Sequence, residues 1–279
     1  MHGTVEFTLL IAGGSFLAGL LGSLTGLGGG VIIVPLLTLA FGVDIRYAIG
    51  ASLVSVIATS SGAAAAYLKE GFSNIRVGMF LEVATTIGAV CGAYLATRIP
   101  TAAIAIIFGA VLLYSAWISV KPEDEVHIHE KTGSLARVLG LDGNYPTPEG
   151  TMAYHVAGVP LGFSLMYVAG VLSGLLGIGS GAVKVLAMDR AMKIPFKVST
   201  TTSNFMIGVT AAASAGIYLH RGYIDPGLAM PVMLGVLAGA LVGARILPEA
   251  KVKTLRIVFG VAIAAVAIEM IVKGVRGNL

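Results

Sequence analysis

Apolar segments separated by short polar or glycine-rich stretches run through almost the whole sequence. Each half of the chain has five, and most are long enough, at about 1.5 Å per helical residue, to cross the roughly 30 Å hydrocarbon core of a bilayer. The second segment of each five has about 13 residues, which predicts a half-helix, a re-entrant piece or part of a broken helix. The pattern therefore predicts an all-α polytopic membrane protein. The segments span residues 4–25, 30–42, 47–68, 77–97 and 101–120 in the first half, and residues 154–176, 181–193, 198–219, 226–247 and 252–273 in the second.

The second half of the sequence repeats the first at a distance of 151 residues. Aligned without gaps, residues 17–115 and 168–266 share about 23 identities in 99 positions. The glycine-rich string from Gly26 to Gly30 falls on the string from Gly177 to Gly181. Because internal repeats are the usual construction of secondary transporters, we expect two structural repeats of about five apolar segments each.

The positive charges favour an inverted arrangement of these repeats. If every segment crosses the membrane, the odd number of crossings in each half inverts the repeats, whereas returning short segments would make them parallel. With an outside N-terminus and five crossings in each half, 12 Lys and Arg residues lie inside and 5 outside, and four crossings would nearly balance the two sides. Since basic residues gather on the cytoplasmic side, we predict inverted repeats.

One long polar stretch, residues 121–153, lies between the repeats. We predict a cytoplasmic linker or small cap there, joining a first transmembrane repeat at residues 1–120 to a second at residues 154–279. Its His127-Ile128-His129-Glu130 string carries side chains that ligate metals, but no second ligand cluster accompanies it, so a solvated loop is the preferred interpretation. We expect no metal ion and no cofactor.

Composition excludes several functional classes. Hydrophobic residues make up 56% of the chain and charged residues 11%, against about 25% charged residues in soluble domains. This excludes an ordinary soluble enzyme, a disordered chain and a nucleic-acid-binding module. The net charge of +4 is interpreted as an orientation signal in a membrane protein. The single cysteine, Cys91, excludes a disulfide framework, a dithiol relay and a cysteine-built metal site.

The two glycine-rich strings are the first candidate site. Each follows one apolar segment and precedes a short one. Glycine lets the backbone turn sharply and approach a ligand, and the next helix begins with unpaired N–H groups and a positive dipole end that attract anions. The other interpretation is that the glycines only permit a tight turn. The candidate substrate-binding residues here are Gly28, Gly29, Gly30, Gly179, Ser180 and Gly181.

Hydroxyl and amide side chains follow both short segments. Ser52 and Ser203 are equivalent in the repeat, and Asn204 lies next to Ser203. These donors are further candidate substrate-binding residues, because they can bind an oxyanion without its complete dehydration. The alternative, common in membrane helices, is hydrogen bonding between helices or to the backbone of the same helix. That alternative is preferred for Ser55, Thr59, Ser199 and Thr210.

Two charged residues lie at membrane depth. Lys184 lies in the second short segment, where the first has Ile33. It either reinforces anion binding, neutralises the empty site or extends to the membrane interface. Glu82 lies about six residues into its segment, with Met233 as its repeat mate. It is a candidate carrier of a coupling proton, and the alternative is an interfacial residue near Arg76.

Other repeat-matched residues are interpreted as structural. The glycines spaced four apart, Gly88 with Gly92 and Gly239 with Gly243, are typical of close helix packing. Tyr67 and Tyr218 are interpreted as anchors at the membrane interface.

The segment from Gly22 to Pro35, with its Gly-Leu-Gly-Gly-Gly string, resembles the opening of the TauE/SafE family of sulfite and organosulfonate exporters. Its partner in the second half runs from Ser173 to Gly181, and the stretches Ala48 to Leu53 and Ser199 to Phe205 are also similar to the family. The resemblance implies a polytopic secondary transporter for small sulfur-containing or carboxylate anions, often driven by the proton gradient. One departure is Leu186, which stands where the first short segment has its proline, so we expect a straighter second short helix.

These observations predict a multi-pass secondary transporter of the cell (inner) membrane, exporting a small anion such as sulfite or an organosulfonate, and not an enzyme. The expected partners are the anion, the lipid bilayer and protons, and no nucleic acid. A passive anion channel on the same scaffold is the first alternative. An intramembrane enzyme or redox carrier would need a nucleophile–base pair or a dithiol at depth. The chain has one cysteine and no histidine deep inside an apolar segment, which argues against both. A structural membrane subunit is the remaining alternative.

Overall fold

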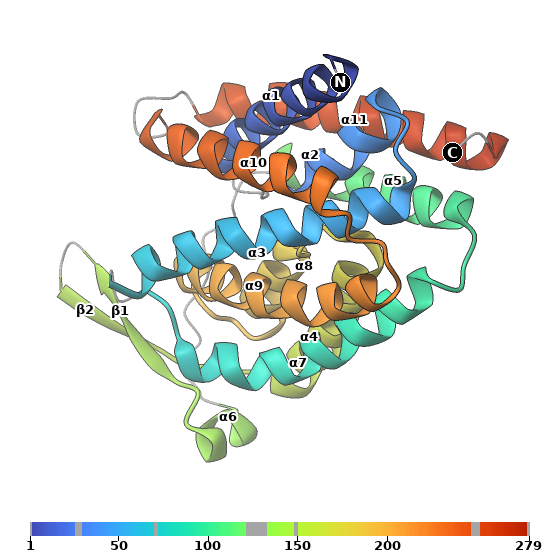
Figure 1. Ribbon diagram of the computed structural model, residues 1–279. Helices are drawn as coiled ribbons and strands as arrows, with labels where there is room; N and C mark the ends of the chain where they lie inside the picture. Colours follow the sequence, from blue (N-terminus) through green and yellow to red (C-terminus); the bar gives the residue numbers. More distant parts are fainter. Residues whose placement is uncertain are drawn as a thin grey trace.

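The computed structural model describes residues 2–25, 30–69, 72–120, 133–147, 150–246 and 252–277. Within these residues the chain forms helices packed side by side, with a two-stranded hairpin and a short helix at one end (Figure 1). The first half contains α1 (His2–Thr25), α2 (Gly30–Pro35), the π-helical turn η1 (Leu36–Ala40), α3 (Ile45–Lys69), α4 (Ile75–Ala96) and α5 (Thr101–Val120). Next come α6 (Ser134–Leu139) and the strands β1 (Gly143–Thr147) and β2 (Gly150–Tyr154). The second half contains α7 (Val159–Leu176), α8 (Gly181–Leu186), the π-helical turn η2 (Ala187–Ala191), α9 (Phe196–His220), α10 (Pro226–Ile246) and α11 (Val252–Arg276).

The helices recur at the spacing of the sequence repeat. α8, η2 and α9 begin and end 151 residues after α2, η1 and α3. Both short helices continue into a π-helical turn, although only the first contains a proline, Pro35. The expectation of a straighter second short helix is therefore wrong, because the wide turn belongs to both copies and does not depend on the proline.

Helices of the two halves pack against each other in pairs. α1 packs on α10, α4 on α7 and α5 on α11, while α3 and α9 lie together in the middle of the bundle (Figure 1). A Cβ atom added at Gly88 or Gly92 of α4 would overlap the carbonyl oxygens of Tyr167 and Val171 of α7. Gly239 of α10 has the same relation to α1. The packing role predicted for these three glycines is confirmed.

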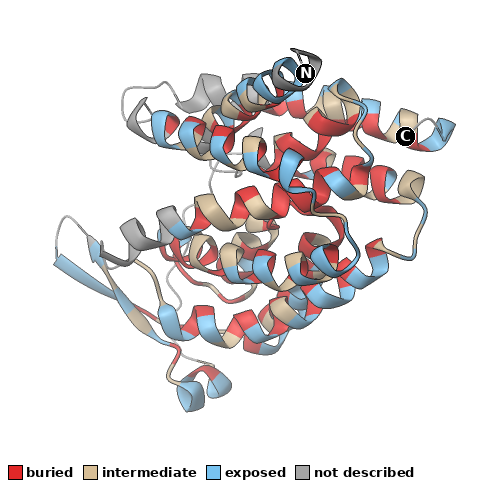
Figure 2. Ribbon diagram, viewed as in Figure 1, coloured by how far each residue is buried: buried red, intermediate tan, exposed pale blue. Residues whose placement is uncertain are grey.

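The outward faces of the helices are largely apolar. On α4, the exposed side chains of Met79, Val83, Ile87, Val90 and Tyr94 recur every three or four residues, while the opposite face of the helix is buried (Figure 2). Soluble monomers rarely expose contiguous apolar surface of this kind. Among the described residues, α4, α7 and the first 18 residues of α10 are long and apolar enough to cross a membrane. These features indicate a helical membrane protein.

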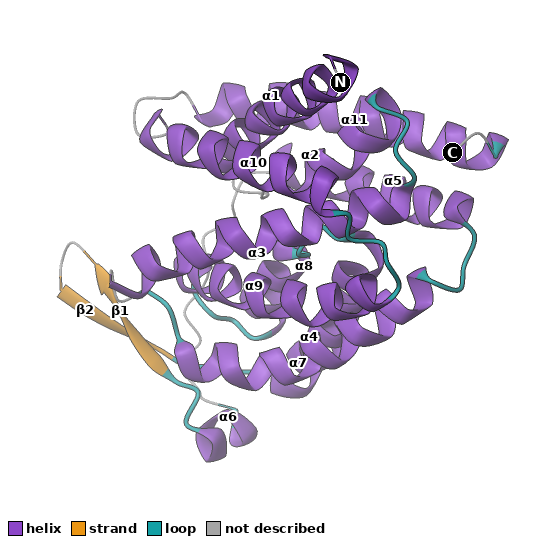
Figure 3. Ribbon diagram, in the orientation of Figure 1, coloured by secondary structure: helices purple, strands orange, loops and turns teal. Residues whose placement is uncertain are grey.

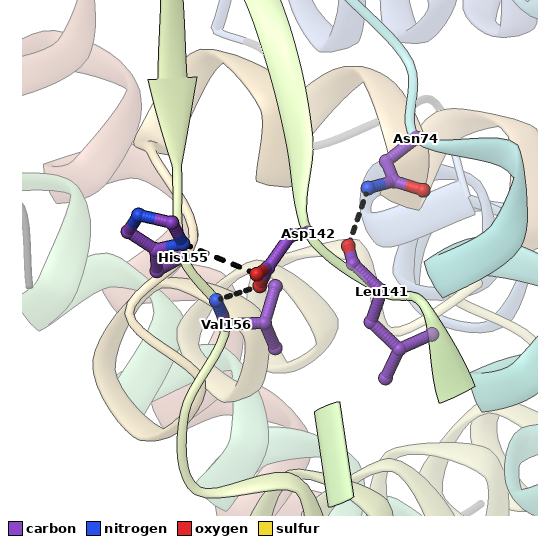
Figure 4. A network of polar contacts seen from close by, with 5 residues as sticks. All are labelled: Asn74, Leu141, Asp142, His155 and Val156. Atoms are coloured by element: carbon purple, nitrogen blue, oxygen red, sulfur yellow. Dashed lines mark hydrogen bonds and ion pairs between the residues drawn. The ribbon is translucent and has the colours of Figure 1, made fainter. Parts of the chain in front are cut away.

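The hairpin and α6 form a small cap, residues 133–156, at one end of the bundle (Figure 3). The strands are antiparallel, with Gly143 opposite Tyr154 and Thr147 opposite Gly150. Asp142 closes the base of the hairpin, since its Oδ1 accepts a 2.8 Å bond from Val156 N (Figure 4). The hairpin lies in the polar stretch, and the all-α expectation did not include it. Residues 121–132, with the His127–Glu130 string, are outside the described part.

Asn74 joins the cap to the helices. Its Oδ1 caps α4 by accepting from Val77 N at 3.0 Å, and its Nδ2 donates to the Leu141 carbonyl at 3.0 Å (Figure 4) and to the Tyr154 hydroxyl at 2.6 Å. Burial raises the pKa of Tyr154 above its ordinary value. The Asn74 backbone N donates to Thr202 Oγ1 of α9 at 3.0 Å. Asn74 therefore links the cap to the helix that carries Ser203.

Candidate functional site

The first short helix begins against the second glycine-rich turn. A Cβ atom added at Gly30 would lie 2.9 Å from Ser52 Oγ and 3.1 Å from the carbonyl oxygen of Gly177. Ser52 Oγ is buried and donates to the same Gly177 carbonyl at 2.7 Å. Gly28 and Gly29 lie outside the described residues. Of the first-half candidates, Gly30 and Ser52 are therefore held together beside a turn of the other half.

The second glycine-rich turn has a left-handed backbone. Gly177 and Gly179 have φ angles of 67° and 71°, and Ser180, which is not a glycine, has a φ of 44°. Such a conformation is uncommon for a serine and is often found at functional sites. Ser180 occupies the N-cap position of α8, yet its side chain makes no capping bond, and its buried Oγ has no partner among the described residues. Buried hydroxyls are normally hydrogen-bonded, so this oxygen is available to a ligand or a water molecule.

The start of the first short helix and the second glycine-rich turn meet at Val56 of α3. A Cβ atom at Gly30 would lie 2.9 Å from one methyl group of Val56, and a Cβ atom at Gly179 would lie 3.4 Å from the other. Ser203 Oγ donates to the Gly181 carbonyl at 3.3 Å. The structure therefore gathers these candidates around α3 and α9. Asn204 is half-buried on α9, and no hydrogen bond among the described residues joins its side chain to the group.

A small cavity lies at the second turn. Its volume is about 10 Å³, which is about the space that one water molecule needs. Its lining includes two serines, Ser115 and Ser180, and the other lining residues are Val31, Val111, Leu172, Ile178, Gly181 and Val183. The site is thus nearly closed in this structure, and a substrate larger than water requires the surrounding helices to separate.

A second polar cluster lies deep among α4, α8 and α9. Lys184 is fully buried, and its Nζ donates to Thr210 Oγ1 at 2.6 Å. Thr210 Oγ1 in turn lies 2.7 Å from Glu82 Oε1 and 2.9 Å from the Met206 carbonyl, which are the two acceptors for its hydrogen. Thr86 donates to the same Glu82 oxygen at 3.2 Å. We call Lys184, Thr210 and Glu82 the buried charge cluster.

This cluster corrects two alternatives for the charged residues. Lys184 does not extend to the membrane interface, because none of its surface is exposed. Glu82 is not an interfacial partner of Arg76, because it is 8% exposed and bonded to Thr210 and Thr86, while Arg76 donates to the Gly140 carbonyl in the cap. Glu82 Oε2 is buried without a partner in the described structure. An unpaired carboxylate oxygen in such surroundings is a ready acceptor for a proton.

Thr210 makes both kinds of hydrogen bond that the sequence predicts for it, one to the Met206 carbonyl of its own helix and one to Glu82 of α4. The sequence does not predict that these bonds place it between Lys184 and Glu82. The available signal was its position seven residues after Ser203, which is two turns further along the same helix face. The interfacial interpretation of Tyr218 is wrong, because its side chain is fully buried and its hydroxyl donates to the Gly174 carbonyl at 3.1 Å. The side chain of its mate Tyr67 is outside the described part.

Comparison with known proteins identifies the family. A family model described as sulfite exporter TauE/SafE matches residues 11–270. The chain belongs to the TauE/SafE family. The TauE/SafE match spans both halves, the two glycine-rich turns and the buried charge cluster.

The curated relatives are probable membrane transporters. YunE of Bacillus subtilis is 27% identical over 279 residues, covering 97% of this chain and 99% of the relative. YdhB of the same organism is 28% identical over 231 residues, covering 82% and 86% of the two chains. MJ0441 of Methanocaldococcus jannaschii is 26% identical over 277 residues, covering 94% of each. No solved structure matches the chain. Family and relatives together indicate a membrane transporter.

Proposed function

We propose that this protein is a multi-pass secondary transporter of the cell (inner) membrane that exports a small anion such as sulfite or an organosulfonate. The observation that carries the proposal is the approach of Gly30, at the start of the first short helix, to the second glycine-rich turn beside Val56. Ser52 and Ser203 bond there to the carbonyls of Gly177 and Gly181. Backbone amides and the Ser180 hydroxyl, which is unpartnered in the described structure, attract negative charge in a low-dielectric interior. The Ser52 and Ser203 hydroxyls join them by turning away from the Gly177 and Gly181 carbonyls. The proposed substrate-binding residues are Gly28, Gly29, Gly30, Ser52, Gly179, Ser180, Gly181, Lys184, Ser203 and Asn204.

The nearly closed site supports alternating access as the proposed mechanism. A cavity of about 10 Å³ must widen for any anion to bind, and the recurrence of helices at a 151-residue spacing provides two similar halves that can move against each other. The proposed halves are inverted across the membrane. This supports a carrier over a continuously open anion channel.

We propose that Glu82 carries the coupling proton. Its unpartnered Oε2 can accept a proton, and the Thr210 hydroxyl links its other oxygen to Lys184. An anion drawn toward Lys184 competes with Glu82 for the ammonium group, so protonation of Glu82 favours anion binding. Anion and proton then occupy the protein together, and the buried charge stays balanced. The two therefore move in the same direction, and export proceeds when the outward gradient of the anion exceeds the inward proton gradient.

The test uses purified protein in proteoliposomes with labelled sulfite, several sulfonates and several carboxylates, with and without a pH gradient. We expect uptake of at least one anion against its gradient, and a loss of about tenfold or more in the double variant Ser52→Ala, Ser203→Ala. The control Ser164→Ala removes an exposed hydroxyl whose hydrogen bond in the described structure is to the Pro160 carbonyl of its own helix, and this variant should transport normally. No flux of any anion in the panel would refute the proposal, and flux without accumulation would indicate a channel.

The role of Glu82 is tested separately with Glu82→Gln. Glutamine keeps the shape and accepts the Thr210 hydrogen bond, but it cannot exchange a proton. We expect exchange of anion across the membrane to continue while the pH gradient no longer drives accumulation. Accumulation by Glu82→Gln equal to that of the unmodified protein would place the coupling proton elsewhere.

A further inference from the structure

An apolar groove opens on the outer surface of the bundle beside the candidate site. Its volume is about 410 Å³, within the range of about 300–1,000 Å³ typical of small-molecule sites. The lining side chains come from the middle of α5 and from α7 and α8. They are Ile106, Ile107, Ala110, Val111, Tyr114, Leu172 and Val183.

The groove leads to the small cavity at the second glycine-rich turn. Val111, Leu172 and Val183 line both hollows. At the inner end lie Ser115 and Ser180. Ser180 is only 4% exposed, and its hydroxyl has no partner among the described residues. The two hollows therefore adjoin, and we call them together the path. Its outer part is apolar, and the lining of its inner part includes Ser115 and Ser180.

We propose that this path binds the substrate as an anion with a short apolar tail. One oxygen of a sulfonate head fills the water-sized inner cavity and accepts from Ser180, while the hydrocarbon tail lies in the groove along α5. The assignment rests on the proposed function, and it narrows the substrate class from small anions in general to organosulfonates with an alkyl or aryl substituent. Bare sulfite would leave the groove unfilled.

The Ser180 hydroxyl favours such a substrate over a membrane lipid as the occupant. A lipid acyl chain could fill the groove, but its polar head lies at the membrane surface and brings no oxygen or nitrogen to Ser180. A buried hydroxyl without a partner is unfavourable, and with a lipid in the groove only a trapped water molecule could partner Ser180. A short amphiphilic anion satisfies the groove and the hydroxyl together.

The test measures binding and transport of straight-chain alkanesulfonates, from methanesulfonate to octanesulfonate, by the full chain in proteoliposomes, with protein-free liposomes as the blank. Each methylene buried in the groove should raise affinity about threefold to fourfold until the groove is full. Ala110→Phe, which fills the groove, should lower octanesulfonate affinity at least tenfold and leave methanesulfonate and sulfite unchanged. The matched control Ala262→Phe places the same ring on an exposed position of α11 and should change neither.

Ser180→Gly tests whether the Ser180 hydroxyl binds the sulfonate head of the substrate. Glycine tolerates the left-handed backbone, so this variant removes the hydroxyl without adding strain. We expect it to weaken binding of every chain length by a similar factor, whereas Ala110→Phe alters only the dependence on chain length. Parallel shifts in Ser180→Gly together with a flattened series in Ala110→Phe support the inference.

Three results would overturn it. If affinity does not change with chain length while the protein still transports sulfite, the groove does not bind the tail, and the proposed function is unaffected. A chain-length dependence that persists in Ala110→Phe places the tail elsewhere. If a lipid co-purifies with the protein, and octanesulfonate cannot displace that lipid while Ala110→Phe removes it, the groove is a lipid site. Absence of flux for every anion is different, because it refutes the proposed function itself.

Discussion

Removing one charge from the buried charge cluster should destabilise the protein more than removing both. The changes are Lys184→Met, Glu82→Met and the double variant. Both side chains are at least nine-tenths buried, and the two hydrogen bonds through Thr210 place Lys184 Nζ within 5.3 Å of Glu82 Oε1. At that distance the attraction is about 3 kcal/mol for an effective dielectric constant of about 20. A single variant loses this attraction and leaves an uncompensated charge, at a cost of about 3–5 kcal/mol in the free energy of unfolding.

The double variant should recover most of that loss. Two methionines of similar length restore an apolar interior, and swaps that conserve volume cost less than about 1.5 kcal/mol. Thr210 keeps the Met206 carbonyl as its acceptor. The repeat-equivalent positions already carry apolar side chains, because the repeat mates of Lys184 and Glu82 are Ile33 and Met233.

The assay is reversible unfolding in mixed detergent micelles, followed by circular dichroism, for all three variants and for the control Ile33→Met. The control changes the equivalent buried position of the first half without touching a charge and should lose less than about 1.5 kcal/mol. A double variant that is the least stable of the three, with costs that add, would refute the reasoning. It would mean that the two charges are not coupled through Thr210.

Three further predictions concern packing and the cap. Gly92→Ala should lower the free energy of unfolding in the same detergent assay by about 1–3 kcal/mol, because the added Cβ would overlap the Val171 carbonyl. The control Gly216→Ala has open space around the added Cβ and should be neutral or slightly stabilising. Asn74→Ala should speed hydrogen exchange of the hairpin amides measured by mass spectrometry, and unchanged exchange would show that other contacts hold the cap. Because burial raises the pKa of Tyr154, its contribution to stability is complete below about pH 10 and declines as pH rises through the raised value. Tyr154→Phe should remove this alkaline loss of cap protection, and persistence of the loss would assign it to another group.

The fold was largely predictable because its signals are local. Apolar length and glycine position depend on neighbouring residues, and each predicted segment corresponds to helix, with boundaries within a few residues in most cases. The segment expected from residue 154 differs most, since β2 extends to Tyr154 and α7 begins at Val159. The orientation of the repeats across the membrane remains a prediction.

The sequence by itself determined the helical segments, the duplication and the positions of the glycine-rich turns, because hydrophobic burial and backbone freedom are properties of short stretches of chain. Only the tertiary structure decided which polar groups meet. Ser52 bonds to Gly177 rather than to its repeat mate, and Glu82 lies beside Thr210, 128 residues further along the chain. Whether a charge is buried depends on the helices packed around it, and those helices come from both halves of the chain.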